Sequence, residues 1–167
     1  MNWSRLFRHL FATRRELGRA FPASTLTAIE DAVAASELTH SAEIRFALEG
    51  SLEPGAIRHG KTPRARALEV FTALGVWDTE ANNGVLIYVL LADQDVEIVA
   101  DRGFNGRVSA DEWSAVCQSM ERLFGSGEFA SGALAGVRQV GEILARQFPP
   151  LPGGRDEDEL PNRPAML

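Results

Sequence analysis

A continuous apolar run in the middle of the chain limits the possible folds more than any other stretch of the sequence. The run covers residues 84–92, follows the turn-forming pair Asn82-Asn83 and contains one polar-tipped side chain, Tyr88. A short Asp-Gln-Asp break separates it from a second segment, 96–100, in which β-branched residues predominate. Turn signals around a buried run of this length are typical of a central strand, and the break predicts a hairpin. The core is therefore expected to form around β structure at residues 84–100.

The stretch before this hairpin predicts a second strand, parallel to the first. Residues 43–49 alternate strictly, with three large apolar residues on one face and charged or small residues on the other, which predicts a half-buried strand. Residues 50–61 show no periodicity and predict a loop, after which Thr62 and Pro63 mark the start of a helix. The order strand, helix, strand favours parallel pairing of 43–49 with 84–92 through a right-handed crossover.

Helical periodicity marks three further segments, at residues 23–37, 109–124 and 131–148. The last of these contains three glycines, which lower helix stability and so indicate close backbone packing. Together with the strands, these segments predict an α/β (mixed α+β) fold in which a mixed sheet with a central β-hairpin lies between helices. One domain is expected at residues 21–148, with an additional basic amphipathic helix at 1–20 and a proline-rich acidic tail at 149–167.

The N-terminal helix combines an apolar stripe with a positive charge. Residues 1–20 hold five Arg and one Glu, a net charge of +4, which leaves −10 for the remaining chain because the whole chain carries −6. Such a helix fits the acidic body of its own domain, a protein partner or an anionic membrane surface, and the sequence leaves these alternatives open. The candidate interface residues are the apolar stripe and the basic positions within it: Trp3, Phe7, Leu10, Phe11, Arg5 and Arg8.

Charge and composition argue against several classes of protein. Nucleic-acid binding requires a basic surface, and this chain is acidic. No apolar run reaches the roughly 20 residues of a membrane span, and arginines interrupt the first apolar residues, unlike in a signal peptide. The single cysteine, Cys117, forms no internal disulfide and fits a buried position. We expect a cytoplasmic protein, peripheral to the inner membrane if the first helix binds lipid.

The hairpin also carries a family resemblance. The segments Asn82-Asn83-Gly84-Val85-Leu86-Ile87-Tyr88-Val89-Leu90 and Val96-Glu97-Ile98-Val99-Ala100-Asp101-Arg102-Gly103-Phe104 resemble the TPM domain. This family is named from thylakoid-lumen, photosystem-repair and receptor-modulator members. The later segment Gly125-Ser126-Gly127-Glu128-Phe129-Ala130-Ser131-Gly132-Ala133-Leu134 is similar to the family's downstream helix boundary. The resemblance covers residues 22–148.

The resemblance implies a mixed sheet of about four strands between helical layers. It also implies either an acid-phosphatase-like activity or divalent-metal binding, the two properties assigned to family members. The chain departs from secreted and membrane-tethered members, because it has Asp101-Arg102-Gly103 in place of a glycine-rich segment and shows no signal peptide or transmembrane helix. It is more similar to a bacterial subgroup encoded near membrane-associated proteins.

Oxygen-bearing side chains gather at the two ends of the predicted hairpin. Residues that enter one strand lie beside residues that leave its antiparallel partner, so Asp78, Glu80, Asn83 and Asp101 are expected near one end of the sheet. Carboxylate and amide oxygens suit Ca²⁺ or Mg²⁺, and these four residues are the predicted weak metal site. Asp93 and Asp95, at the opposite end, are the alternative.

Two functions of different classes follow. The preferred one is a non-enzymatic accessory or interaction domain that binds a protein partner or the cytoplasmic membrane face, with a weak divalent-metal site. The alternative is a metal-dependent acid-phosphatase-like hydrolase. The chain contains no P-loop and no nucleophile constellation, so no catalytic residue is assigned, and the oligomeric state is left open.

Overall fold

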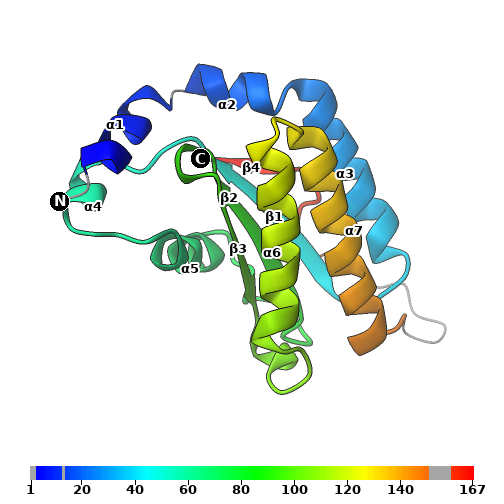
Figure 1. Ribbon diagram of the computed structural model, residues 1–167. Helices are drawn as coiled ribbons and strands as arrows, with labels where there is room; N and C mark the ends of the chain where they lie inside the picture. The colour runs from blue at the N-terminus through cyan, green and yellow to red at the C-terminus, as the bar shows by residue number, and fades with distance from the viewer. Residues whose placement is uncertain (1–2, 13, 151–158) are drawn as a thin grey trace.

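The computed structural model describes residues 3–12, 14–150 and 159–167, and the side chains of Trp3 and Leu6 lie outside this description. A four-stranded sheet in the order β3-β2-β1-β4 forms its centre (Figure 1). The strands are β1 (Glu43–Glu49), β2 (Gly84–Leu90), β3 (Asp95–Ala100) and β4 (Ala165–Met166). β1 runs parallel to β2 and to β4, and β3 runs antiparallel to β2. The predicted mixed sheet, parallel pair and central hairpin are therefore confirmed.

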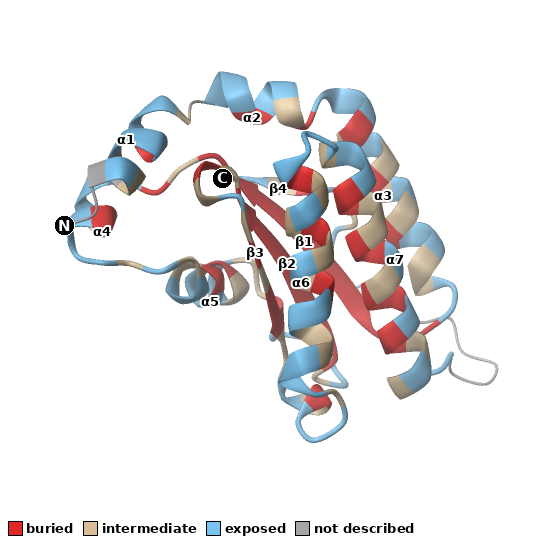
Figure 2. Cartoon of the chain, viewed as in Figure 1, coloured by how far each residue is buried: buried red, intermediate tan, exposed pale blue. Residues whose placement is uncertain are grey.

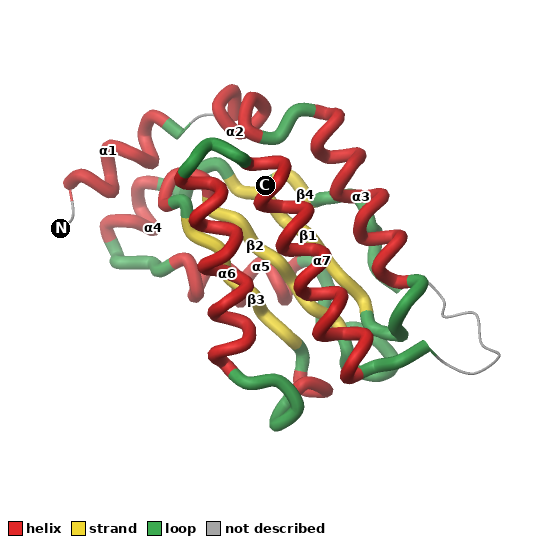
Figure 3. The backbone as a smooth tube through the Cα atoms, turned by 45° about the vertical axis from the view of Figure 1, so that its right-hand side comes forward, coloured by secondary structure: helices red, strands yellow, loops and turns green. Residues whose placement is uncertain are grey.

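Helices cover both faces of this sheet. Their bounds are α1 Trp3–Phe11, α2 Arg14–Ala20, α3 Ala23–Glu37, α4 Pro54–Arg58, α5 Pro63–Ala73, α6 Ala110–Gly125 and α7 Phe129–Gln147. Two short 3-10 turns, η1 (Leu91–Asp93) and η2 (Arg102–Phe104), follow β2 and β3. α3, α6 and α7 lie on one face and α5 lies on the other, as Figure 3 shows from a second direction.

The two faces of the sheet bury separate apolar clusters. Side chains of alternate strand residues, such as Phe46 and Ile87, pack with α3, α6 and α7, and the other set, including Leu86 and Tyr88, packs with α5. All residues of β1 and β2 are buried, so the sheet is red throughout its central strands in Figure 2. The prediction of a half-buried β1 is therefore wrong, because α5 and the C-terminal segment cover its second face.

Three local elements differ from the sequence prediction. The described residues of the predicted helix at 1–20 form two helices, α1 and α2, and residues 50–61 contain the short helix α4, which Pro54 begins. A helix of this length carries too few apolar positions for a period to be detected. The third difference is β4, a strand of two residues within the predicted proline-rich tail.

The predicted helix signals agree with the structure. Ser109 and Glu112 form a capping box at the start of α6, and the Thr62 side chain accepts a hydrogen bond from the Ala65 backbone at the start of α5. A Cβ at Gly136 would lie 2.2 Å from Met120 Sδ, and one at Gly141 would lie 2.1 Å from Ser36 Oγ. The glycines of α7 therefore permit close packing against α6 and α3, as predicted.

Candidate functional site

The carboxylate of Asp93, just beyond the carboxyl end of β2, holds the N-terminal helix. Arg5 Nε donates a hydrogen bond to Asp93 Oδ2 (2.9 Å), and Arg5 Nη2 lies 2.8 Å from the same oxygen. The third nitrogen of this guanidinium, Nη1, donates to the backbone carbonyl of Lys61 (2.9 Å). Arg8 is more distant, with its Nη2 atom 3.6 Å from Asp93 Oδ1. Asp93, one of the alternative metal residues, is thus the anchor of α1.

His9, one helical turn after Arg5 in α1, also contacts Asp93. Its side chain is 1% exposed, its Nδ1 accepts a hydrogen bond from the Leu52 backbone N–H (2.9 Å), and its Nε2 lies 3.1 Å from Asp93 Oδ1. An Nδ1 that accepts from an N–H places the ring proton on Nε2, where it faces the carboxylate. Burial lowers the pKa of His9 and outweighs the opposing effect of Asp93, so the ring is neutral at pH 7.

With α1 docked in this way, three of its apolar side chains lie on the surface. Phe7, Leu10 and Phe11 are 55%, 53% and 71% exposed. Beside them lies an open groove of about 910 Å³ between the N-terminal helices, η1 and the start of α7. Its lining is largely apolar and includes Phe7, Phe11, Ala12, Ala20, Leu91, Ala92 and Phe129. The name aromatic-basic surface is used below for Phe7, Leu10 and Phe11 with the exposed arginines 8, 14, 15 and 19.

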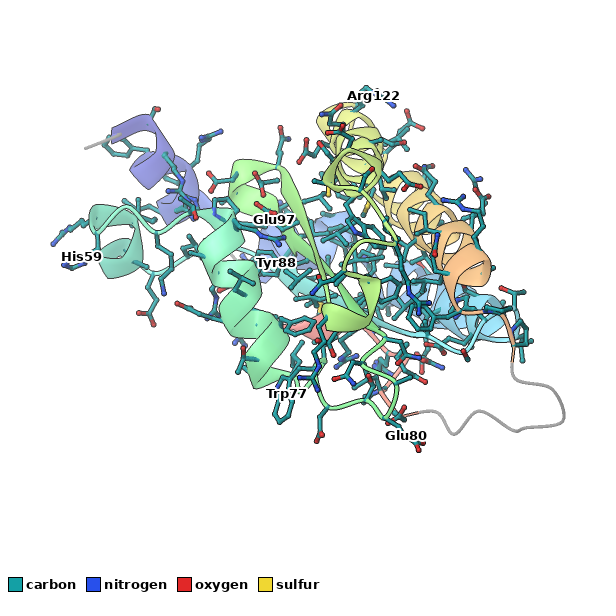
Figure 4. All side chains as sticks on the ribbon, turned by 90° about the horizontal axis from the view of Figure 1, so that it is seen from below. His59, Trp77, Glu80, Tyr88, Glu97 and Arg122 are labelled. Atoms are coloured by element: carbon teal, nitrogen blue, oxygen red, sulfur yellow. The ribbon has the colours of Figure 1, made fainter. Side chains whose placement is uncertain are left out.

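The four residues of the predicted metal site have different environments. Asp78 and Glu80 are exposed, and Glu80 lies near the C-terminal segment (Figure 4). Asn83 is buried and its amide donates to the Ser41 carbonyl, while Asp101 Oδ1 accepts from the Arg102 backbone N–H (2.7 Å). The alternation of β2 and β3, continued by one residue, places Asn83 and Asp101 on opposite faces of the sheet.

The fit of a divalent cation to this end of the sheet is therefore partial. Among the described residues, Asn83 Oδ1 and Asp101 Oδ2 are shielded from water and have no hydrogen-bond partner. Oxygens in this state are able to coordinate a cation. Within the same part of the chain, no group of three or more His, Cys, Asp or Glu side chains is arranged to hold a metal ion.

Asp95, the second alternative metal residue, lies in an acidic cleft at the outer edge of β3. Burial, together with the charges of Glu97, Glu121 and Asp93, raises the pKa of Asp95 to about 6. The edge itself is blocked by side chains, because Glu121 Oε1 accepts from the Val96 N–H (3.1 Å) and Arg64 Nη1 donates to the Ile98 carbonyl (2.6 Å). Such blocking prevents a further strand from pairing with β3.

A buried polar network lies under α5, where no site is predicted from the sequence. The Tyr88 hydroxyl donates to Glu49 Oε2 (2.7 Å), and Arg66 Nε donates to the same oxygen (2.9 Å). Burial, followed by Glu49, raises the pKa of Tyr88, so its hydroxyl stays protonated. A buried tyrosine hydroxyl needs a hydrogen-bond partner, and Glu49 supplies it for Tyr88. Figure 4 shows Tyr88 beneath α5.

The sequence and the fold match one known family. A family model described as the TPM domain matches residues 18–143. The NMR structure of the BA42 protein from the psychrophilic bacterium Bizionia argentinensis has a TM-score of 0.75 and 35% sequence identity, over 87% of this chain and 94% of that chain. No curated protein matches the chain. The chain therefore belongs to the TPM domain family.

The residues that the sequence did not indicate as a site are His9, Glu49, Arg66 and the backbone groups of Leu52 and Lys61. Their contacts join segments that are far apart in the chain, so spacing alone carries no signal for them. The sequence did contain one signal for the docking face of α1: Arg5 and His9 lie four positions apart, on the same side of a helix, among apolar residues. In the part of the chain that the structure describes, no helix has the length and apolar character needed to cross a membrane.

Proposed function

We propose that this TPM domain is a non-enzymatic interaction domain, and that its aromatic-basic surface binds an anionic membrane. The observation that carries the proposal is the orientation of α1, which uses its polar residues Arg5 and His9 for docking and leaves Phe7, Leu10 and Phe11 exposed. A surface helix normally buries its apolar stripe against its own domain. An exposed group of large apolar side chains is typical of an interaction surface.

The surrounding charges favour an anionic membrane over an apolar protein groove. Four exposed arginines, at positions 8, 14, 15 and 19, accompany the three apolar residues, whereas the chain beyond residue 20 is strongly acidic. Each basic residue near an anionic leaflet contributes about 1 kcal/mol, and apolar side chains add to this by entering the headgroup region. The acidic remainder is repelled by the same surface, so only one orientation is favourable.

The proposal is tested by sedimentation of the full chain with vesicles that contain phosphatidylserine. We expect binding at low salt and at least a tenfold loss of partitioning when Phe7, Leu10 and Phe11 are all replaced by serine, because each side chain contributes roughly 1 kcal/mol or more on partial burial. Added salt is expected to weaken binding of the wild-type chain, since exposed charges are screened.

Two other exposed leucines provide a matched control. Leu38 and Leu68 are 82% and 47% exposed and lie outside the N-terminal helices, so their replacement by serine is expected to leave partitioning unchanged. Equal sedimentation of the triple variant and the wild-type chain would contradict the proposal. Failure of the wild-type chain to sediment at low salt would contradict it as well, and would favour a protein partner for the same surface.

A divalent-metal site at the Asp101 end of the sheet stays a second proposal. Its support is Asp101 Oδ2, which is shielded from water and has no hydrogen-bond partner among the described residues. Asparagine carries no charge, so it cannot replace aspartate as an anionic ligand. Titration calorimetry with Ca²⁺ and Mg²⁺ on the wild-type chain and on Asp101→Asn tests it directly. The hydrolase alternative rests on family resemblance alone, and hydrolysis of p-nitrophenyl phosphate tests that alternative.

A further inference from the structure

The groove beside α1 exists because the two N-terminal helices are held to the domain at separate points. Arg5 and His9 fix α1 to Asp93, and Leu17, which is 2% exposed, fixes α2 to the main apolar cluster. Between these contacts the two helices form an arch over the connection from β2 to β3 (Figure 1). The groove of about 910 Å³ lies between this arch, η1 and the start of α7.

The floor of this groove belongs to the packed part of the domain. Phe129 stacks on Phe124 with ring centres 5.6 Å apart, and it meets Phe21 edge to face at the same distance. Ala92 is 8% exposed, and its N–H donates to the Gly50 carbonyl (3.0 Å), which fixes η1 in place. A floor of packed rings and hydrogen-bonded backbone keeps its shape without a ligand, and sites for small molecules are usually preformed in this way.

The groove separates apolar from charged groups. Apolar side chains of the arch, η1 and α7 make up most of its described lining, and its charged members are Arg8, Arg19 and Glu16. All three charged residues are exposed, so their charges lie at the mouth of the groove. A ligand that lies along the apolar walls must carry few polar groups, because each would lose its hydrogen bonds to water. Two arginines against one glutamate favour a negative charge at the mouth.

We propose that this groove binds a long-chain fatty acid as a monomeric anion, with its hydrocarbon chain along the apolar walls and its carboxylate beside Arg8 and Arg19. The volume lies within the range of about 300–1,000 Å³ that is typical of small-molecule sites. A peptide brings an N–H and a carbonyl group at every residue, and an apolar lining offers few partners for them. The inference goes beyond membrane binding, because a dissolved fatty acid needs no bilayer.

The test measures binding of cis-parinaric acid, a fatty acid that fluoresces in apolar surroundings, to the full chain below the concentration at which the acid aggregates. We expect saturable binding and displacement by oleate. Ala20→Trp places a large ring in the groove and is expected to weaken binding at least about tenfold, because several methylene groups of the ligand lose their contacts. Ala34→Trp is the matched control, since Ala34 is exposed on α3 and lies outside the groove.

A second variant tests the position of the carboxylate. Replacing Arg8 and Arg19 together by glutamine is expected to weaken binding about fivefold, because exposed ion pairs contribute little individually. The same variant should lose the preference for oleate over oleyl alcohol, which has the same chain without the charge. Replacing Arg14 and Arg15 by glutamine is the matched control, since these exposed arginines do not line the groove and fatty-acid binding should stay unchanged.

Vesicle sedimentation separates this proposal from membrane binding. Ala20→Trp leaves Phe7, Leu10 and Phe11 in place, so it is expected to sediment with phosphatidylserine vesicles as the wild-type chain does. Thermal melts establish that each variant is folded, and the variant of Arg8 and Arg19 decides the matter if Ala20→Trp is not.

A wild-type chain that sediments with vesicles but shows no saturable binding of cis-parinaric acid would overturn the fatty-acid proposal alone. Binding as tight as that of the wild-type chain in both groove variants would overturn it too. Fatty-acid binding that occurs only when vesicles are present would also overturn it, and would assign the groove to the acyl chain of a membrane phospholipid.

Discussion

Replacing Asp93 with asparagine is expected to release α1 from the domain and to lower the free energy of unfolding by about 3 kcal/mol. The carboxylate is 8% exposed and faces Arg5 and His9, and the Arg5 side chain is 17% exposed. Asparagine has nearly the same shape but removes the negative charge that the Arg5 guanidinium faces at 2.8 Å. Urea denaturation measures the global loss, and hydrogen exchange of the amides of residues 3–11 measures the release of α1.

Asp95→Asn is the control, since it makes the same chemical change two residues away. The pKa of Asp95 is raised to about 6, above the roughly 3.9 of an unfolded chain, so the folded state binds this proton more tightly. Ionisation of Asp95 therefore lowers stability as the pH rises from about 4 to about 6. Asp95→Asn should be more stable than wild type by about 1 kcal/mol at pH 7, and equal to it near pH 4. A loss of stability in both variants would contradict the assigned roles.

Replacing Gly84 with alanine is expected to cost about 3 kcal/mol of unfolding free energy. A Cβ at this first residue of β2 would lie 2.0 Å from the backbone oxygen of Val76, and a backbone atom cannot move aside as the end of a flexible side chain can. Val76 belongs to the buried cluster beneath α5, so the clash would displace the connection between α5 and β2. Thermal or urea denaturation of the variant measures the loss.

Gly125→Ala provides the comparison for this change. Gly125 ends α6, and a Cβ there would meet nothing within 4 Å. Alanine is favoured over glycine in a helix by about 0.5–1 kcal/mol, so this variant is expected to be at least as stable as wild type. If Gly84→Ala proved as stable as Gly125→Ala, the close approach of Val76 to β2 would be wrong.

The core was predictable because its signals are local. The apolar run at 84–92 and the alternation at 43–49 each indicate a strand without knowledge of the rest of the chain, and the caps at Thr62 and Ser109 indicate helix starts. β4 was not predicted because its two residues gain their conformation only from pairing with β1. A proline-rich acidic stretch has no apolar pattern of its own to show that pairing.

The candidate site was predictable only in part. The sequence identified Phe7, Leu10, Phe11 and Asp93 as notable residues, but it placed Asp93 in an alternative metal site. Its pairing with Arg5 and His9 spans more than eighty positions of the chain, and side-chain chemistry alone does not distinguish an anchor from a ligand. The apolar stripe was recognised, yet the residues that dock α1 could be found only from the structure.

A measurement of how deeply α1 enters a membrane tests most directly whether the aromatic-basic surface binds anionic membranes. An environment-sensitive dye attached to Phe11→Cys is compared with the same dye on Leu38→Cys, which lies just beyond the end of α3 on a distant part of the molecule (Figure 1). Burial raises the pKa of the native Cys117 to about 12, so this thiol stays protonated at pH 7 and the labelled wild-type chain serves as the blank.

With phosphatidylserine vesicles at low salt, the dye at position 11 is predicted to brighten about twofold or more and to shift to shorter wavelength, while the dye at position 38 stays unchanged. The response should disappear with neutral vesicles. An equal response at both positions, or no response at position 11, would contradict the claim that the aromatic-basic surface binds anionic membranes.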